Sequence, residues 1–490
     1  MNKQFPDRAN ISHTDKALRG LRQIGSARLI TQVVTWSLTA ITVHLLDPRD
    51  YGLVATAGIV TTLSQMLLDG GLAPTLISQR ELPKSLQGTA MSAVLIFSLL
   101  LAAIIFTTAP LVAAFFRSPP LRLILQVQAL EPPLTALGVA PTVLLSKRMQ
   151  FKSLARIQLT VGISQGLLVL ALAYGGARYW ALIIGDLLGM SFRALLLWMS
   201  LDERPTPALS LRTLQPLIQQ SGHMIAQRLS YFVISNFDIF LIGRVWGPIT
   251  LGTYSVAKSL AHTAVDKIQG VTGQIAVPAF AGNTDVTDQY RNLFNVISVS
   301  AALAFPLFWT MGVVSQVALP ILFGTQWLTL VLPFIAFASI LPLRAIYSIL
   351  NSALVGTGRT SISFRNTLTW LALLLPFILV GVTKGADGVA LSWSAAFPFA
   401  FYLAMRRVAK VFAVSASTLL KPLSKPALCA AAGVLTAEGI LLVCSHHLPS
   451  SIVLVLQTAV SAASYLTLLR YLSRTQYDQT LSFLRRVVSI

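Results

Sequence analysis

Residues 44–79 of this chain, HLLDPRDYGLVATAGIVTTLSQMLLDGGLAPTLISQ, carry the pattern that decides its fold. An apolar segment ends in this stretch, a polar turn follows at residues 47–50, and a second apolar segment begins at once. Proline and glycine at such a turn favour a break between two helices over one continuous helix. The second segment also carries a carboxylate, Asp69, inside its apolar run. The stretch therefore predicts a helical hairpin with a charge inside its second helix.

The same hairpin pattern recurs at residues 244–278, RVWGPITLGTYSVAKSLAHTAVDKIQGVTGQIAVP. Pro48 and Gly52 of the first hairpin match Pro248 and Gly252 of the second, at a constant offset of 200 residues. Internal repetition of this kind is typical of membrane transporters that are built from two related halves. We therefore interpret the two hairpins as corresponding parts of an internal repeat.

The composition is typical of a protein that spans a membrane many times. Of the 490 residues, 54% are hydrophobic and only 11% are charged, whereas soluble proteins carry about 25% charged residues. Apolar segments of roughly twenty residues, long enough to cross a hydrocarbon core of about 30 Å, recur along the chain. The predicted fold class is an all-α polytopic membrane protein with about fourteen transmembrane helices.

The helix pattern divides the chain into two lobes and a C-terminal extension. Six helices are predicted for each lobe, and because six is even, both lobes begin on the same side of the membrane. The repeat is therefore parallel, about a pseudo-two-fold axis along the membrane normal, and Arg28 matches Arg228 in its first helices. The predicted parts are a tail at 1–20, an N-lobe at 21–200, a linker at 201–212, a C-lobe at 213–410, two further transmembrane helices within 411–472 and a tail at 473–490.

The formal charge of +20 reflects membrane topology. About two dozen Lys and Arg residues fall on the side of the N-terminus and about six on the opposite side, which predicts that both termini are cytoplasmic. These residues are spread over short loops and form no basic domain, so nucleic acid is not an expected partner.

The short loops also argue against an enzyme. No loop exceeds roughly fifteen residues, and the sequence contains no Gly-rich nucleotide loop and no His/Cys spacing typical of a metal site. Cys429 and Cys444 lie in one late apolar segment and are interpreted as small buried residues. We expect no enzymatic activity, no cofactor and no metal.

Polar and charged residues recur at helical spacing inside the predicted membrane segments. A charge at the bilayer centre costs at least about 2.5–3.5 kcal/mol, so such residues normally face a cavity or a partner. Arg and Lys side chains around a cavity would create a positive potential that attracts an anionic head group, and a low-dielectric surrounding would strengthen it. The guanidinium group of arginine can bond two phosphate oxygens at once. The residues predicted to bind this head group and a passing glycan are Arg28, Gln32, Thr35, Arg228, Tyr231, Lys258, His262, Lys267 and Arg344. The acids predicted to exchange a proton or sodium ion are Asp69, Asp238 and Asp266.

Simpler roles remain open for several of these charges. Arg28 lies near a helix end and would be able to extend to the interface. Lys267 has Asp266 as a possible ion-pair partner in a hydrated helix end. Asp186 and Arg193, seven residues apart on one helix, are predicted to form a structural pair, and Glu131 has no assigned role.

Four stretches resemble one family of transporters. They are residues 45–79, the sequence YWALIIGDLLGMSFRALLLW at 179–198, NFDIFLIGRVWGPITLGTYSVAKSL at 236–260 and LVGTGRTS at 354–361. Together they resemble the Wzx-type polysaccharide or O-antigen flippases of the MOP exporter superfamily. The resemblance extends over essentially the whole chain, and the stretches follow the family's order.

The resemblance implies two six-helix lobes in a V around a cationic cavity in the bacterial inner membrane. It implies translocation of undecaprenyl-pyrophosphate-linked oligosaccharide units to the periplasmic leaflet by alternating access, for surface or exopolysaccharide biosynthesis. Membrane lipids, a polysaccharide polymerase and a chain-length regulator are the implied partners, and residues 427–471 would line a groove for the lipid tail. The alternatives are a related multidrug exporter, which should have an acidic cavity, and a membrane glycosyltransferase or polymerase, which should have a long external loop.

Overall fold

The computed structural model describes residues 37–69, 84–203, 206–208, 210, 229, 232–233, 235–263, 265, 286–444 and 448–488. Helices account for nearly all of this part of the chain, and it contains no β-strand. Its helices with defined bounds are α2 (Pro48–Asp69), α4 (Lys84–Phe115), α5 (Pro120–Gln128), α6 (Glu131–Lys147), α7 (Phe151–Tyr174), α8 (Tyr179–Met199), α10 (Val286–Phe323), α11 (Val331–Gly356), α12 (Thr360–Gly381), α13 (Gly385–Val411), α14 (Ala416–Cys444), α15 (Ser450–Leu472) and α16 (Arg474–Val488). Two short 3₁₀ helices, η1 (Thr325–Leu330) and η2 (Val382–Lys384), precede α11 and α13.

Within the described residues, ten stretches are long and apolar enough to cross a membrane. This confirms the predicted all-α polytopic class, because a hydrocarbon environment requires backbone groups to bond within each segment. The count of fourteen stays a prediction, since parts of several predicted helices lie outside the described residues.

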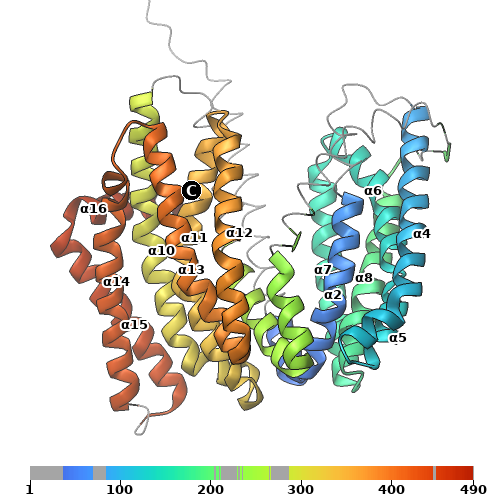
Figure 1. Cartoon of the computed structure of the whole chain (residues 1–490), viewed down its shortest axis with the longest axis horizontal. Helices are drawn as coiled ribbons and strands as arrows, with labels where there is room; N and C mark the ends of the chain where they lie inside the picture. Colours follow the sequence, from blue (N-terminus) through green and yellow to red (C-terminus); the bar gives the residue numbers. More distant parts are fainter. Residues whose placement is uncertain are drawn as a thin grey trace, which may run out of the picture.

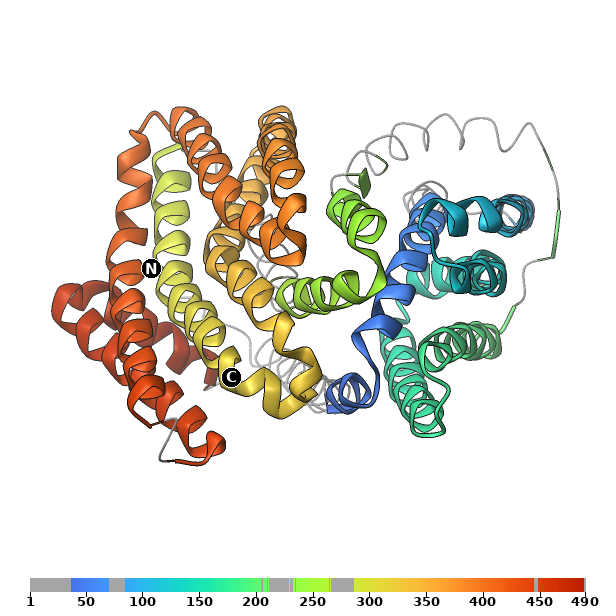
Figure 2. The same cartoon turned by 60° about the horizontal axis from the view of Figure 1, so that its bottom comes forward.

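The helices form two lobes that meet at one end and diverge toward the other (Figure 1). The N-lobe contains α2 and α4 to α8. The C-lobe contains residues 235–263 and α10 to α13, and α14 to α16 pack against it. In a second view, α2 of the N-lobe and residues 235–263 of the C-lobe lie in the middle of the molecule, where the two lobes face each other (Figure 2). We call the end at which the lobes meet, near residues 43–52 and 240–252, the joined end.

The two predicted hairpin turns pack against each other at the joined end. A β-carbon on Gly52 would overlap the carbonyl group of Pro248, and one on Gly252 would overlap the carbonyl group of Pro48. The contact is reciprocal, as a two-fold relation between equivalent turns requires. It agrees with the predicted parallel repeat and shows why both turns need glycine, since only a residue without a β-carbon allows this approach.

Two details depart from the predicted helices. The apolar stretch 120–147, long enough for one membrane span, is divided into α5 and α6 at residues 129–130, shortly before Pro132 and Pro133. Neither proline has an N–H, so the helical bonds that residues 132 and 133 would donate to the carbonyls of residues 128 and 129 are missing. This accounts for the interruption, although Ala129 and Leu130 keep helical dihedral angles. The second departure is α16, an amphipathic helix within the stretch described from sequence only as a tail.

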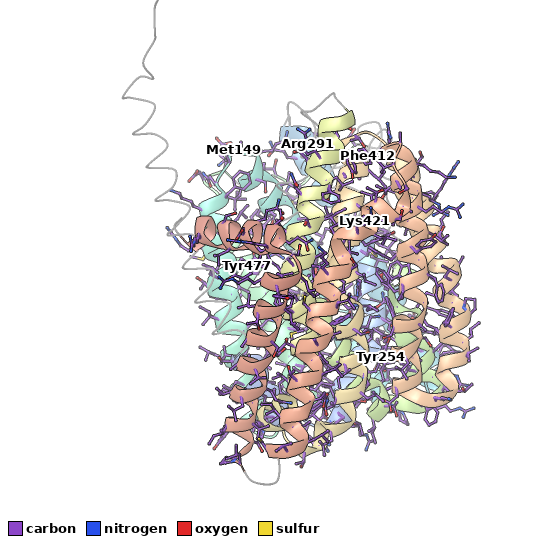
Figure 3. All side chains as sticks on the ribbon, turned by 90° about the vertical axis from the view of Figure 1, so that its left-hand side faces the viewer. Met149, Tyr254, Arg291, Phe412, Lys421 and Tyr477 are labelled. Carbon is purple, nitrogen blue, oxygen red and sulfur yellow. The ribbon has the colours of Figure 1, made fainter. Side chains whose placement is uncertain are left out.

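The C-terminal helices form a layer on the outer side of the C-lobe (Figure 1). α14 and α15 run side by side along α10, while α16 runs across the other helices (Figure 3). Gln476 of α16 donates to the Ser298 hydroxyl at 2.9 Å and to the Pro422 carbonyl at 3.0 Å, which fixes α16 to α10 and α14.

Candidate functional site

A buried group of charged and aromatic residues lies inside the C-lobe. Its members come from residues 235–263, which are helical on both sides of a turn at Gly247 (φ 77°), and from α11 and α13. Side-chain bonds between the two sides of this turn show that they run next to each other. We call the set Asp238, Tyr254, Lys258, His262, Arg344 and Trp393 the C-lobe charge cluster.

The Asp238 carboxylate is the anion of the C-lobe charge cluster and is fully buried. Lys258 Nζ lies 2.8 Å from its Oδ1 and 2.7 Å from its Oδ2, and the Tyr254 hydroxyl donates to Oδ2. The backbone N–H of Ile239 donates to Oδ1 at 2.8 Å. A buried carboxylate needs such partners, because an unpaired charge in a low-dielectric interior is strongly unfavourable.

Arg344 is the second buried cation of the cluster and lies halfway along α11. Its Nη1 atom lies 2.7 Å from Nε2 of His262. A guanidinium can only donate, so Nε2 accepts and the ring is the neutral tautomer with hydrogen on Nδ1. Both cations face the ring of Trp393, with Lys258 Nζ at 5.2 Å and Arg344 Cζ at 5.8 Å from the ring centroid, within the range of cation–π attraction.

Lys258 and Arg344 carry two positive charges and Asp238 carries one negative charge, so the described cluster has a net charge of +1. The spacing of Tyr254, Lys258 and His262 by four residues places all three on one face of their helix. The cluster is therefore a cationic group held in place by hydrogen bonds and by an aromatic ring.

The structure brings together four of the residues that sequence predicted for function, namely Lys258, His262, Arg344 and Asp238. Asp69 is the last residue of α2, and its side chain is outside the described set. The remaining predicted site residues lie outside the described residues: Arg28, Gln32, Thr35, Arg228, Tyr231, Asp266 and Lys267.

Sequence analysis missed Trp393 and the role of Tyr254. Tyr254 precedes Lys258 by one helical turn, a signal that the spacing contained. Trp393 comes from α13, far away in sequence, and no pattern in the sequence indicates that contact. Glu438 of α14 was also missed. Its Oε1 atom accepts from Gln316 of α10 at 2.5 Å.

The N-lobe holds a second polar group, between α2, α6, α7 and α8. Gln65 donates to the buried carboxylate of Glu131. This contact gives a structural role to Glu131, for which sequence analysis had assigned none. Gln165 donates to Asp186 at 2.9 Å. In the described part of the chain Asp186 forms no ion pair with Arg193, so the predicted structural pair is wrong. Gln165 comes from a neighbouring helix, and the seven-residue spacing within α8 gave no sign of it.

Further contacts across the lobes close the joined end. Trp327 of η1 donates its indole N–H to the carbonyl oxygen of Val43 at 3.0 Å and stands edge-on to Tyr51, with ring centroids 5.5 Å apart. Gln326 donates to the His44 carbonyl at 3.1 Å. Phe240 stacks on Phe115 with ring centroids 5.3 Å apart. Aromatic rings and backbone hydrogen bonds thus seal the end at which both hairpins turn.

Comparisons with known proteins agree with this architecture. A family model described as "Polysaccharide biosynthesis protein" matches residues 41–332. The teichuronic acid biosynthesis protein TuaB of Bacillus subtilis is 26% identical over 441 residues, which covers 87% of this chain and 88% of TuaB. The lipopolysaccharide biosynthesis protein WzxC of Escherichia coli is 23% identical over 393 residues, with 78% and 79% covered.

Among solved structures, the lipid II flippase MurJ in an inward closed conformation superimposes with a TM-score of 0.75. The match covers 92% of this chain and 99% of that structure at 13% identity, so it bears on the fold. The family model spans more than half of the chain, and the resemblance drawn from sequence is confirmed. This chain is a multi-pass membrane protein that belongs to the polysaccharide biosynthesis protein family.

Proposed function

We propose that this protein is a flippase for undecaprenyl-pyrophosphate-linked oligosaccharide repeat units. It would move them across the bacterial inner membrane by alternating access, and it would act as a transporter and not as an enzyme. The observation that carries the proposal is a buried cationic cluster in one of two lobes whose described helices meet at one end and diverge toward the other. Its family relatives act in the biosynthesis of teichuronic acid and lipopolysaccharide, according to their names.

The pyrophosphate is the part of this substrate that the C-lobe charge cluster suits best. Arg344 is one of the two buried cations of the cluster and faces the same Trp393 ring as Lys258. Its planar guanidinium matches phosphate oxygens in pairs. His262 and Trp393 orient Arg344, through a hydrogen bond and a cation–π contact respectively. Lys258, Arg28, Arg228 and Lys267 would add to the positive potential, and Gln32, Thr35 and Tyr231 would bind sugar hydroxyls.

The closed state of the joined end supports an inward-facing arrangement. The loops at the joined end lie on the side that is poor in lysine and arginine, so the positive-inside rule places this end at the periplasm and both termini in the cytoplasm. The divergent end would then receive substrate from the cytoplasmic leaflet. Release requires that the reciprocal glycine–proline contact separates and that the opposite ends of the lobes approach.

The lipid tail of the substrate needs an apolar path outside the sugar site. A groove of about 470 Å³ lies between α10, α15 and α16, and Pro306, Leu307, Met311 and Leu466 are among the residues that line it. An undecaprenyl chain matches its apolar lining. The groove supports the proposal of a path for the lipid tail, but its lining differs from the expected residues 427–471. Its lining residues come from α10, α15 and α16, and none of them belongs to α14.

Asp69 and Asp266 remain the proposed acids for coupling to a proton or sodium gradient, whereas Asp238, the third acid predicted from sequence, is bonded to Lys258. Membrane lipids surround the protein, and a polysaccharide polymerase and a chain-length regulator are its proposed partners downstream.

The deciding experiment is translocation of a defined lipid-linked oligosaccharide in proteoliposomes, with and without a proton or sodium gradient. Arg344→Gln should lower the rate at least tenfold. Arg406→Gln removes one positive charge from an exposed position on α13 and should leave the rate unchanged. Equal rates for wild type and Arg344→Gln would refute the proposed role of Arg344, and no translocation by the wild type would refute the proposed function.

In cells, an Arg28→Ala/Arg228→Ala double variant should lose surface polysaccharide at unchanged protein level.

A further inference from the structure

The ammonium group of Lys258 has the surroundings of a bound metal cation. Three oxygen atoms lie within hydrogen-bond distance of Nζ: the Ser235 carbonyl at 2.7 Å and both oxygens of Asp238 at 2.8 and 2.7 Å. The Lys258 side chain is 9% exposed and that of Asp238 is 0% exposed. Carboxylates and backbone carbonyl oxygens are ligands with which proteins bind alkali and other hard cations, also inside membrane transporters.

The helix backbone contributes to this arrangement. The carbonyl oxygen of Ser235 accepts from Lys258, and the backbone N–H of Ile239 donates to the Asp238 carboxylate. Ser235, Asp238 and Ile239 lie on one side of the Gly247 turn, and Lys258 lies on the other side. The geometry therefore describes an oxygen-lined site on one side of the turn, filled by a side chain from the other side.

The site has room for one positive charge. Asp238 Oδ1 accepts from Lys258 and Ile239, and Oδ2 accepts from Lys258 and Tyr254, so each oxygen already has two donors. Arg344 faces the same Trp393 ring as Lys258. A further cation would meet two like charges in a low-dielectric interior, which is strongly unfavourable.

We propose that Asp238 and the Ser235 carbonyl form a monovalent-cation site whose resident cation is the ammonium group of Lys258. No free sodium or potassium ion then exchanges at Asp238 during transport, and the coupling ion binds elsewhere. This deepens the proposed function and rests on it only for the consequence in transport. The cation site itself is testable on purified protein without any substrate.

Removal of the ammonium group should open the site to a small cation. The test is thermal unfolding of full-length protein in detergent, in sodium, potassium or choline chloride at equal ionic strength. In the wild type no salt ion should bind at Asp238, so Asp238→Asn should show the same dependence of the unfolding temperature on salt as the wild type. Lys258→Ala should unfold roughly 2 °C higher in sodium or potassium than in choline, because a ligand of the folded state stabilises it. Asp238→Asn/Lys258→Ala, which lacks the anion, should show no difference between the salts.

A second measurement uses an ammonium ion in place of the metal. Methylammonium and ethylammonium should raise the unfolding temperature of Lys258→Gly but leave that of wild type and of Asp238→Asn/Lys258→Gly unchanged.

Two results would overturn the inference. Stabilisation of wild type by sodium or potassium, lost in Asp238→Asn, would make Asp238 an exchangeable ion site. A folded Lys258→Ala with equal unfolding temperatures in all three salts would reduce the pair to an ordinary salt bridge. The same conclusion follows if Lys258→Ala fails to fold in every salt while the double variant folds. None of these outcomes depends on whether the protein translocates a lipid-linked oligosaccharide.

Discussion

Gly52 of α2 lies so close to the carbonyl group of Pro248 that a β-carbon at position 52 would overlap it. The equivalent pair, Gly252 and Pro48, repeats this contact in the other direction. Two helices from different lobes thus approach each other through backbone atoms at a point where the lobes must separate for transport. Because this contact involves backbone atoms and no interlocking side chains, few side-chain contacts have to break when the joined end opens.

Gly52→Ala and Gly252→Ala should each prevent this approach. The added methyl group meets backbone and not a movable side chain, so we expect a loss of about 1–3 kcal/mol of stability, typical of overpacking. Polysaccharide export should fall at equal protein level. The measurements are thermal unfolding of the purified variants and export in complemented cells.

Gly58→Ala is the matched control on the same helix. A β-carbon at Gly58 meets nothing within 4 Å. Alanine in a helix interior is more favourable than glycine by about 0.5–1 kcal/mol, so this variant should be at least as stable as wild type. Equal unfolding temperatures and equal export for Gly52→Ala and Gly58→Ala would show that the close approach at Gly52 contributes neither to stability nor to transport.

Trp327 provides a second test of the joined end. Trp327→Phe keeps a large ring against Tyr51 but removes the hydrogen bond to the Val43 carbonyl, which is worth about 0.5–1.5 kcal/mol. The loss falls on the closed state alone and should shift the protein toward opening at this end. A cysteine at the buried position Leu46 should therefore react faster with a membrane-impermeant thiol reagent.

Trp309→Phe is the control for the loss of an indole hydrogen bond at a place other than the joined end. The Trp309 indole donates to the Ser339 carbonyl at 2.9 Å, and both residues belong to the C-lobe. This substitution should leave the labelling rate at position 46 unchanged. If both tryptophan variants accelerate labelling equally, the effect is a general loss of stability and not an opening of the joined end.

Sequence predicted the hairpins, the lobes and the parallel repeat because their signals are local or periodic. The helices follow from apolar runs long enough to span a bilayer, and the repeat follows from a proline and a glycine that recur at a fixed offset. The contact partners were harder to predict. Arg344 was recognised as a buried charge, but its proximity to His262 and Trp393 depends on how three helices pack. Glu438 was missed because its partner Gln316 belongs to α10, far away in the sequence.

The glutamine–carboxylate contact in the N-lobe predicts coupled energetics. Gln65 donates to the buried Glu131 carboxylate, so Gln65→Leu should cost about 1–3 kcal/mol by leaving an acceptor with fewer donors. With leucine at both positions, the loss should be smaller than the sum of the two single losses. Thermal unfolding of both single variants and the double variant completes the cycle. Additive losses would show that the contact contributes nothing to stability.

The groove between α10, α15 and α16 makes the last prediction, and it separates a lipid-tail path from an ordinary lipid-facing surface. Leu466 lines the groove and is half exposed, so Leu466→Trp should fill part of its volume of about 470 Å³ while the surrounding helices remain packed. If the undecaprenyl chain occupies this groove, export should fall several-fold with no change in unfolding temperature. Leu442→Trp on α14 places the same bulk on a side chain that is 76% exposed and absent from the groove lining, and it should export normally. A shorter lipid carrier should lessen the Leu466→Trp defect in proteoliposomes, because less of its tail needs the blocked path. Normal export by Leu466→Trp would mean that the tail travels elsewhere, and equal defects in both variants would assign the effect to bulk at the lipid surface.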